Sequence, residues 1–127
     1  MEKPQHLDIL KKLKGTIYVV GGNHDNKKVC KKLQELGITV LGCLQYKGFI
    51  CTHIPIHPSQ LELFRGNIHG HIHISGNIEG FGFYRIQLLE GRYFNVNTEL
   101  HGYKPVLFDD IVRHFAEKEL EESGFGR

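Results

Sequence analysis

The most constraining feature of this sequence is an apolar run that stops abruptly at two glycines. Residues 16–20 are rich in β-branched side chains, residues 21–22 are both glycine, and a helical pattern begins at residue 26. This order predicts a buried strand over 16–20, a tight glycine turn and a helix over 26–36. In open α/β sheets, ligands bind beyond the carboxyl ends of the strands. We therefore expect a binding edge at the three polar residues of the turn, which are Asn23, His24 and Asp25.

Histidines are concentrated further along the chain. Five of the nine fall within 21 positions, at His53, His57, His69, His71 and His73. Side chains two residues apart on a strand face the same way, so a strand over 67–70 that leads into this run predicts that His71 and His73 point into one cavity. His53 follows another predicted strand, over 49–52. Imidazole nitrogens bind zinc, manganese, iron and nickel, and Asn23 adds an amide oxygen, so the sequence predicts a divalent metal site.

Each of these signals also has a simpler interpretation. Taken by itself, His53 is more typically a surface residue that forms hydrogen bonds. His-x-His pairs also occur on exposed edge strands. Asn and Asp are both common helix N-caps, which is a second role for the residues of the glycine turn. His57 and His69 are expected in loop or supporting roles. The combination of these residues at successive strand ends favours the metal site.

The rest of the pattern predicts short strands mixed with helices. This mixture favours an α/β layer structure, in one domain over residues 1–127. The other predicted elements are a helix over 5–14 that Gly15 ends, a strand over 38–41, a loop over 42–47, a loop with one helical turn over 54–66, a hairpin of strands 81–89 and 92–97, and a helix over 109–122 with Ile111, Val112, Phe115 and Leu120 on one side.

Composition narrows the class of protein. Of the 127 residues, 40% are hydrophobic and 24% are charged, as in ordinary globular domains. No apolar run reaches the roughly 18–20 residues that span a bilayer, so we expect no membrane partner, and the first residues do not form a secretion signal. Three cysteines without close pairing (Cys30, Cys43 and Cys51) favour a reducing, cytoplasmic setting.

Charge gives a weaker signal about partners. The formal net charge is only +2, which does not indicate nucleic acid as a partner. Clustered lysines on both sides of the glycine turn favour an anionic substrate, or else they are the solvated faces of two amphipathic helices. These residues are Lys11, Lys12, Lys14, Lys27, Lys28, Lys31 and Lys32.

Taken together, the motifs resemble those of a known family. Gly22-Asn23-His24-Asp25, then His53, then Gly70-His71-Ile72-His73 resemble the third, fourth and fifth motifs of the calcineurin-like metallophosphoesterases, with the spacing of compact bacterial and phage members. Residues 95–99 and 103–106 resemble the closing strand and turn of that family. The resemblance runs from about residue 7 to residue 115, and it implies a sandwich of mixed β-sheets flanked by helices.

The resemblance also implies roles for individual residues. In that family two divalent metals clamp a phosphate ester while a metal-activated water attacks phosphorus. It implies that Asn23, His53 and His71 bind one metal and that His73 belongs to the other. It further implies that His24 stabilises the leaving-group oxygen or acts as general acid, with Asp25 orienting it. The metal is expected to be manganese, zinc, nickel or iron, because imidazole and amide ligands suit all of these ions.

The sequence departs from the family at its beginning. The family's Asp-x-His and Gly-Asp motifs are missing, and the only aspartates are Asp8, Asp25, Asp109 and Asp110. We therefore expect an N-terminally truncated member of the family. It would be a phosphoesterase that uses one metal or is completed by another chain, or a non-catalytic metal- or phosphate-binding or interaction module, or a purely structural domain. Strand 16–20 would then expose an edge that pairs with a second copy or with a complementing chain.

Overall fold

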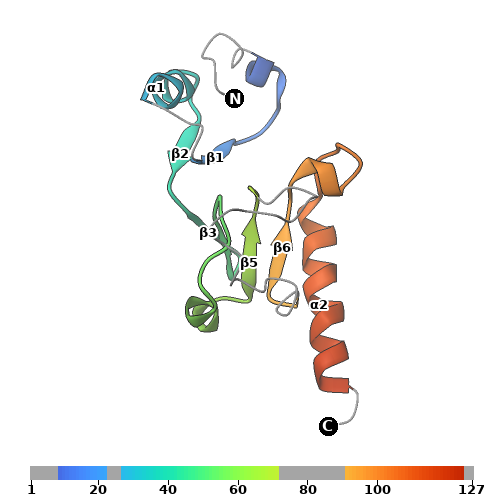
Figure 1. Ribbon diagram of the computed structural model, residues 1–127. Helices are drawn as coiled ribbons and strands as arrows, with labels where there is room; N and C mark the ends of the chain where they lie inside the picture. The colour runs from blue at the N-terminus through green and yellow to red at the C-terminus, as the bar shows by residue number, and fades with distance from the viewer. Residues whose placement is uncertain (1–8, 23–26, 72–90, 125–127) are drawn as a thin grey trace. The chain divides into compact units, whose positions relative to one another are not determined.

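The computed structural model describes residues 9–22, 27–71 and 91–124 (Figure 1). These residues form a mixed α/β arrangement with two β-sheets, as the sequence predicts for the general class. The internal contacts of the chain divide it into two compact units, Met1–Leu44 and Gln45–Arg127. The prediction of a single domain over 1–127 stays a prediction.

The first unit contains a strand, a helix and a second strand. Strand β1 (Tyr18–Val20) is followed by helix α1 (Lys27–Glu35) and strand β2 (Thr39–Leu41). The two strands pair in parallel, with Tyr18 opposite Thr39. Parallel neighbours require a crossover connection, and α1 lies within it. These elements confirm the strands expected over 16–20 and 38–41 and the helix expected over 26–36, each slightly shortened.

The core of this unit is built by one face of α1. Val29 and Leu33 lie four residues apart on the helix, are both buried, and pack with Ile38. Gly37 ends the helix with a positive φ of 81°. Its N–H donates to the Gln34 carbonyl and the Ile38 N–H donates to the Leu33 carbonyl, which together make a Schellman cap. The glycine stop at residue 37 therefore works as the sequence predicts.

The described residues of the second unit, together with Leu44, form a four-stranded sheet. In spatial order its strands are β3 (Leu44–Tyr46), β4 (Phe49–Cys51), β5 (Gly66–His69) and β6 (Tyr93–Asn95). Strands β4, β5 and β6 run parallel to one another. The carboxyl ends of these three strands therefore meet at one edge of the sheet.

One prediction in this unit is wrong. Residues 42–47 are not a continuous loop, because residues 44–46 form β3, which neighbours β4 in the sheet. The connection between the two strands is only Lys47 and Gly48, whose φ values are both positive, at 49° and 89°. Positive φ at both central residues is what a two-residue type I′ hairpin turn requires. A lysine at the first of these positions gives little sequence signal for such a turn.

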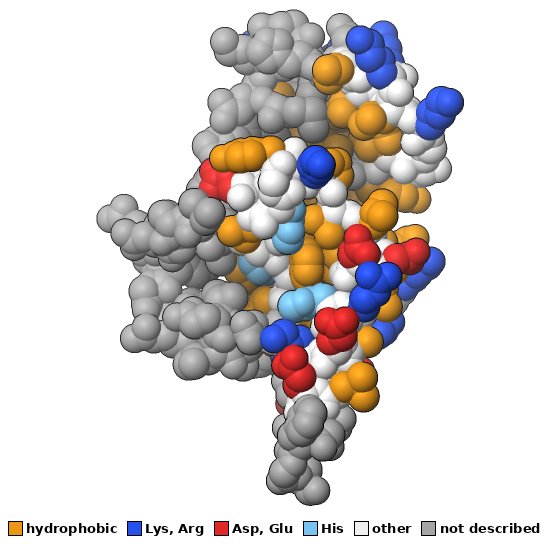
Figure 2. Space-filling model, turned by 90° about the vertical axis from the view of Figure 1, so that its right-hand side faces the viewer, with side chains coloured by type: hydrophobic (Ala, Val, Ile, Leu, Met, Phe, Trp, Pro, Cys, Tyr) orange, Lys and Arg blue, Asp and Glu red, His pale blue; other side chains and the backbone are white. Residues whose placement is uncertain are grey.

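Helix α2 (Phe108–Gly124) covers one face of this sheet, and Figure 1 shows it running alongside β6. Its buried residues Ile111 and Phe115 pack against Phe49 and Ile68 of the sheet. The exposed side carries interspersed acidic and basic side chains (Figure 2), including the pairs Arg113–Asp110 at 3.4 Å and Lys118–Glu121 at 3.5 Å. This confirms the predicted helix and its apolar side, except at Leu120, which is 67% exposed.

The opposite face of the sheet is covered by the segment between β4 and β5. Within this segment lies the 3₁₀ helix η2 (Pro58–Leu63), whose Leu61 is buried. All four residues of β5 are buried, as expected for a parallel strand covered on both faces. A second 3₁₀ helix, η4 (Thr98–Leu100), follows β6.

The outcome of the other predictions varies. Residues 9–12, the described middle of the predicted helix 5–14, form a 3₁₀ turn. The strand over 81–89 lies outside the described residues, so the predicted hairpin stays a prediction. Its other half is confirmed as β6, which pairs in parallel with β5. Among the described residues, no helix combines the length and the apolar character needed to cross a bilayer.

Close packing at the first residue of β5 gives a testable consequence. A Cβ atom on Gly66 would lie 2.7 Å from Cζ of Phe115, in a ring that α2 holds fully buried. We expect Gly66→Ala to lower the free energy of unfolding by about 1–3 kcal/mol, because overpacking forces the ring or the backbone to shift. Urea denaturation monitored by circular dichroism measures this change.

Two control variants accompany it. Gly42→Ala places a Cβ where nothing lies within 4 Å, so its stability should match that of the parent. Adding Phe115→Leu to Gly66→Ala should cost less than the sum of the two single changes, because the overlap is already relieved. Additive effects would contradict the proposed overlap.

Candidate metal centre

The edge where β4, β5 and β6 end carries two of the predicted metal ligands. His53 comes two residues after β4, and His71 comes two residues after β5. Backbone hydrogen bonds continue beyond the strands and hold the chain ends side by side. These bonds run from Thr52 N to Ile68 O (2.9 Å), from Gly70 N to His53 O (3.0 Å) and from Val96 N to His69 O (2.8 Å).

The two imidazole rings are in direct contact. Nε2 of His53 lies 3.0 Å from Nδ1 of His71, and the ring centroids are 4.8 Å apart with an interplanar angle of 61°. Both side chains are partly buried. Without a metal, one ring N–H donates to the lone pair of the other ring. The structure therefore brings together two of the four predicted ligands, His53 and His71.

The same nitrogens fit the coordination sphere of a divalent ion. Two metal–nitrogen bonds of about 2.0–2.1 Å, at angles between a right angle and the tetrahedral angle, place the nitrogens about 2.9–3.4 Å apart. The 3.0 Å separation of the His53 and His71 nitrogens lies within this range. Imidazole is also the type of donor that zinc, manganese and nickel accept. These two residues can hold a metal together.

His71 reaches this position by a different route from the one predicted. It does not continue a strand, because β5 ends at His69 and His71 has a positive φ of 67°. The assumption that His71 and His73 share the face of one strand is therefore wrong at His71. A left-handed backbone is uncommon for residues other than glycine, although histidine adopts it more readily than most. Such conformations are concentrated at functional sites, where the surrounding structure stabilises them.

The remaining predicted site residues lie outside the described residues. They are Asn23, His24, Asp25 and His73. Their convergence with His53 and His71 stays a prediction. Within residues 9–22, 27–71 and 91–124, no group of three or more His, Cys, Asp or Glu side chains is arranged to hold a metal ion.

Comparisons with known proteins do not add to this picture. No protein-family model, curated protein or solved structure matches the chain. A functional assignment rests on the histidine pair and on the resemblance of the motifs.

His69 supports the turn that carries His71. It is 2% exposed, its ring contacts Tyr93, and its Nδ1 lies 3.0 Å from the carbonyl oxygen of Gly70, to which it can donate. Among the described residues, its Nε2 has no hydrogen-bond partner. Burial lowers the pKa of His69, although the contact with the Gly70 carbonyl opposes the shift, so the ring is neutral at neutral pH. This position agrees with the supporting role expected for His69.

His57 lies further from the pair, in the loop before η2. Its Nδ1 accepts a hydrogen bond from the Ser59 N–H at 3.2 Å, and it is the N-cap of the 3₁₀ helix. This is the loop role that the sequence predicts.

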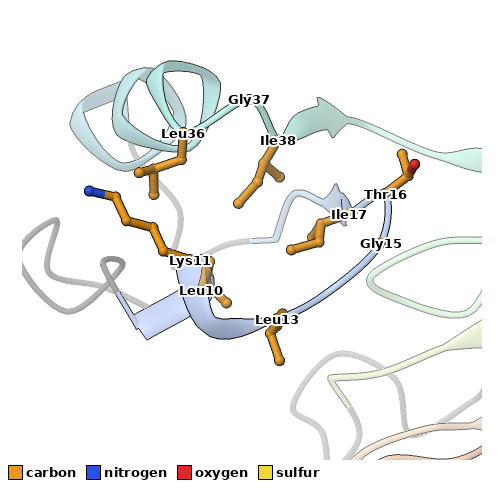
Figure 3. A pocket seen from close by; sticks show the side chains of 9 residues that line it. All are labelled: Leu10, Lys11, Leu13, Gly15, Thr16, Ile17, Leu36, Gly37 and Ile38. Carbon is orange, nitrogen blue, oxygen red and sulfur yellow. The ribbon is translucent and has the colours of Figure 1, made fainter.

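Two cavities lie away from the histidine pair. The larger, of about 430 Å³, is in the first unit (Figure 3), and the side chains that line it are apolar except for those of Lys11 and Thr16. It lies before β1 and β2, at their amino ends, where residues 15–17 and 37–38 contribute. A smaller one, of about 320 Å³, surrounds the Lys47–Gly48 turn of the second unit. Neither lining includes His53 or His71, and neither has side chains suited to metal binding.

The lowered pKa of His69 predicts how stability depends on pH. The unfolded chain binds a proton near the ordinary histidine pKa of about 6.5, whereas the buried ring resists it, so unfolding takes up a proton in this range. The free energy of unfolding should therefore fall as pH drops below about 6.5. Urea denaturation of the chelator-treated protein, repeated between pH 7.5 and pH 5, measures the slope.

Replacing the ring tests whether His69 is the source of this slope. His69→Phe should flatten the dependence on pH, whatever its effect on stability at pH 7.5. Ile68→Val lowers stability without removing a titrating group and should keep the slope. A slope that is the same in His69→Phe and in the parent would show that other groups produce it.

Proposed function

We propose that this chain is a metal-dependent phosphoesterase that hydrolyses a phosphomonoester or a phosphodiester. The observation that carries this proposal is the 3.0 Å approach of the His53 and His71 nitrogens at the carboxyl ends of two adjacent parallel strands. Ligand sites in sheets of this kind occupy that edge. The resemblance of the motifs supplies the reaction class, together with the finer assignment of the fold as a truncated calcineurin-like sandwich.

The residues of the chain have distinct roles in this proposal. His53 and His71 bind the metal through neutral ring nitrogens, with Asn23 completing the set and His73 serving a second metal. A bound divalent ion supplies a Lewis acid for the phosphate oxygens and an activated water for attack on phosphorus. His24 donates to the leaving-group oxygen, and Asp25 holds its ring in the required orientation. The metal is manganese, zinc, nickel or iron.

A second candidate is a module that binds a metal or phosphate without turnover. It is favoured because the described residues bring together two imidazoles and no carboxylate ligand. A site with fewer anionic ligands binds a cation more weakly and leaves more of its positive charge for a phosphate group. Binding without hydrolysis distinguishes this candidate from the enzyme.

The first test is metal-dependent hydrolysis. We expect the protein with Mn²⁺ or Ni²⁺ to hydrolyse an aryl phosphodiester or an aryl phosphomonoester, which absorbance of the released phenolate measures. His24→Ala should reduce the rate without affecting metal binding. His71→Ala should weaken Mn²⁺ or Zn²⁺ binding in calorimetry by about tenfold or more, since loss of even a supporting residue costs that much.

His57→Ala is the matched control, because His57 lies outside the pair and should leave both measurements unchanged. Metal binding without turnover above the His24→Ala background would favour the binding module. Absence of binding heat in the parent protein would contradict both candidates.

We also propose that β1 is an interaction edge, for a second copy or for a complementing chain. Ile17 O accepts from Thr39 N at 3.3 Å, and Gly21 N donates to Leu41 O at 2.8 Å. Since successive residues of a strand direct their backbone groups to opposite sides, Tyr18 and Val20 direct theirs away from β2. Among the described residues, β2 is the only sheet neighbour of β1. The Tyr18 side chain is 51% exposed at this edge.

This edge predicts self-association. Light scattering on the parent protein should show a mass above that of the monomer, increasing with concentration. Tyr18→Pro removes an N–H from the outer edge without removing a bond to β2, so it should shift the mass toward the monomer. Tyr18→Thr keeps the N–H and is the matched control. A parent protein that stays monomeric at high concentration would contradict the proposal.

The three cysteines support a cytoplasmic setting. Cys30, Cys43 and Cys51 are all free thiols. Free thiols are typical of proteins in reducing compartments.

A further inference from the structure

The second unit contains a fully buried amide that belongs to none of the sequence motifs. Asn67 is the second residue of β5 and is 0% exposed. Its neighbour Gly66 faces Phe115 of α2, so the alternation of the strand directs the Asn67 side chain to the opposite face. That face is covered by the segment that follows β4, which carries His53.

The amide forms hydrogen bonds with this segment on both sides of His53. Its Nδ2 donates to Ile50 O at 2.9 Å and to the Thr52 hydroxyl at 3.0 Å, and Ile68 O is a longer third acceptor at 3.4 Å. Its Oδ1 accepts from Ile56 N at 2.9 Å. The backbone groups fix the orientation of the amide, because only the oxygen can face an N–H and only the nitrogen can face a carbonyl.

Two further hydrogen bonds hold the backbone of the same segment. The Thr52 hydroxyl, which accepts from Asn67, donates to Ile54 O at 2.5 Å. The Tyr93 hydroxyl donates to Ile56 O at 2.7 Å. The backbone is thus held just before His53 and just after it, and the His53 carbonyl itself accepts from Gly70 N.

We propose that Asn67 is a positioning residue that holds His53 in contact with His71. This inference rests on the proposed metal centre, and it adds that the centre requires the buried amide of Asn67. The hydrogen bonds of the Asn67 side chain go to neither histidine ring, and it acts by fixing the backbone from residue 52 to residue 56. Without the amide, the Ile56 N–H loses its bond to Asn67 Oδ1 and the Thr52 hydroxyl loses its bond from Asn67 Nδ2, both at a partly buried site. The His53 ring is then free to leave the 3.0 Å contact.

Two variants test this role in the full chain. Asn67→Ala removes every bond of the amide. Thr52→Val keeps the shape of the side chain but removes the hydroxyl that links Asn67 to the residue after His53, and it covers the case in which Asn67→Ala does not fold. Ile68→Val is the control, since its side chain points toward α2 and touches none of these bonds.

The probe is Co²⁺ alone, titrated while its visible absorption bands report ligation by imidazole. We expect Asn67→Ala to weaken Co²⁺ binding about tenfold or more, as loss of residues that orient metal ligands generally does, and Thr52→Val to weaken it less. Ile68→Val should bind as the parent does. Thermal unfolding of each variant shows whether the differences in Co²⁺ affinity follow differences in stability instead.

A second readout needs no metal. In the chelator-treated protein, nuclear magnetic resonance should show contacts between the two rings in the parent and in Ile68→Val. These contacts should be lost or weakened in Asn67→Ala, together with protection of the Ile56 amide from hydrogen exchange. Unchanged ring contacts and unchanged Co²⁺ affinity in both Asn67→Ala and Thr52→Val would overturn the inference.

The two proposals fail in different ways. If the parent protein binds no Co²⁺, the metal centre is wrong, and the ring contacts still decide whether Asn67 positions His53. If the parent binds Co²⁺ and both variants bind it equally well, the metal centre stands and the positioning role is wrong.

Discussion

The second unit depends on the parallel pairing of β4, β5 and β6. Parallel pairing brings strand ends together that are far apart along the chain, here the ends before His53 and before His71. Both faces of β5 are also buried. One face packs against α2, and the other faces the segment that contains η2. The histidine pair is a consequence of this arrangement, since the backbone bonds that continue past the strands set its spacing.

Much of this arrangement could be predicted from the sequence because it depends on local patterns. Continuous apolar runs identify β1, β2 and β4, and the apolar spacing with Gly37 identifies α1. The gathering of His53 and His71 at one edge follows from placing both at the ends of strands. Strand β3 was not predicted, because its hairpin turn uses lysine where a glycine or an asparagine would signal it.

The features that the sequence could not provide depend on tertiary context. The orientation of His71 comes from a left-handed backbone, which no periodicity of side chains encodes. Asn67 appears as one polar residue in a short strand, and only the buried acceptors and donors around it show its purpose. In both cases the groups that show the role of the residue lie more than ten positions away in the sequence. The signal is a polar amide in a strand whose four residues are all buried, and that burial is visible only in the structure.

The separation of His53 and His71 along the chain also has a consequence for folding. The two positions are 18 residues apart in the sequence, and their rings meet only after β4 and β5 have paired. The His53–His71 pair is therefore not preformed in the unfolded chain, and a metal ion held by this pair cannot guide the early steps of folding. It would instead bind the native protein selectively and raise its stability in proportion to the logarithm of the metal concentration.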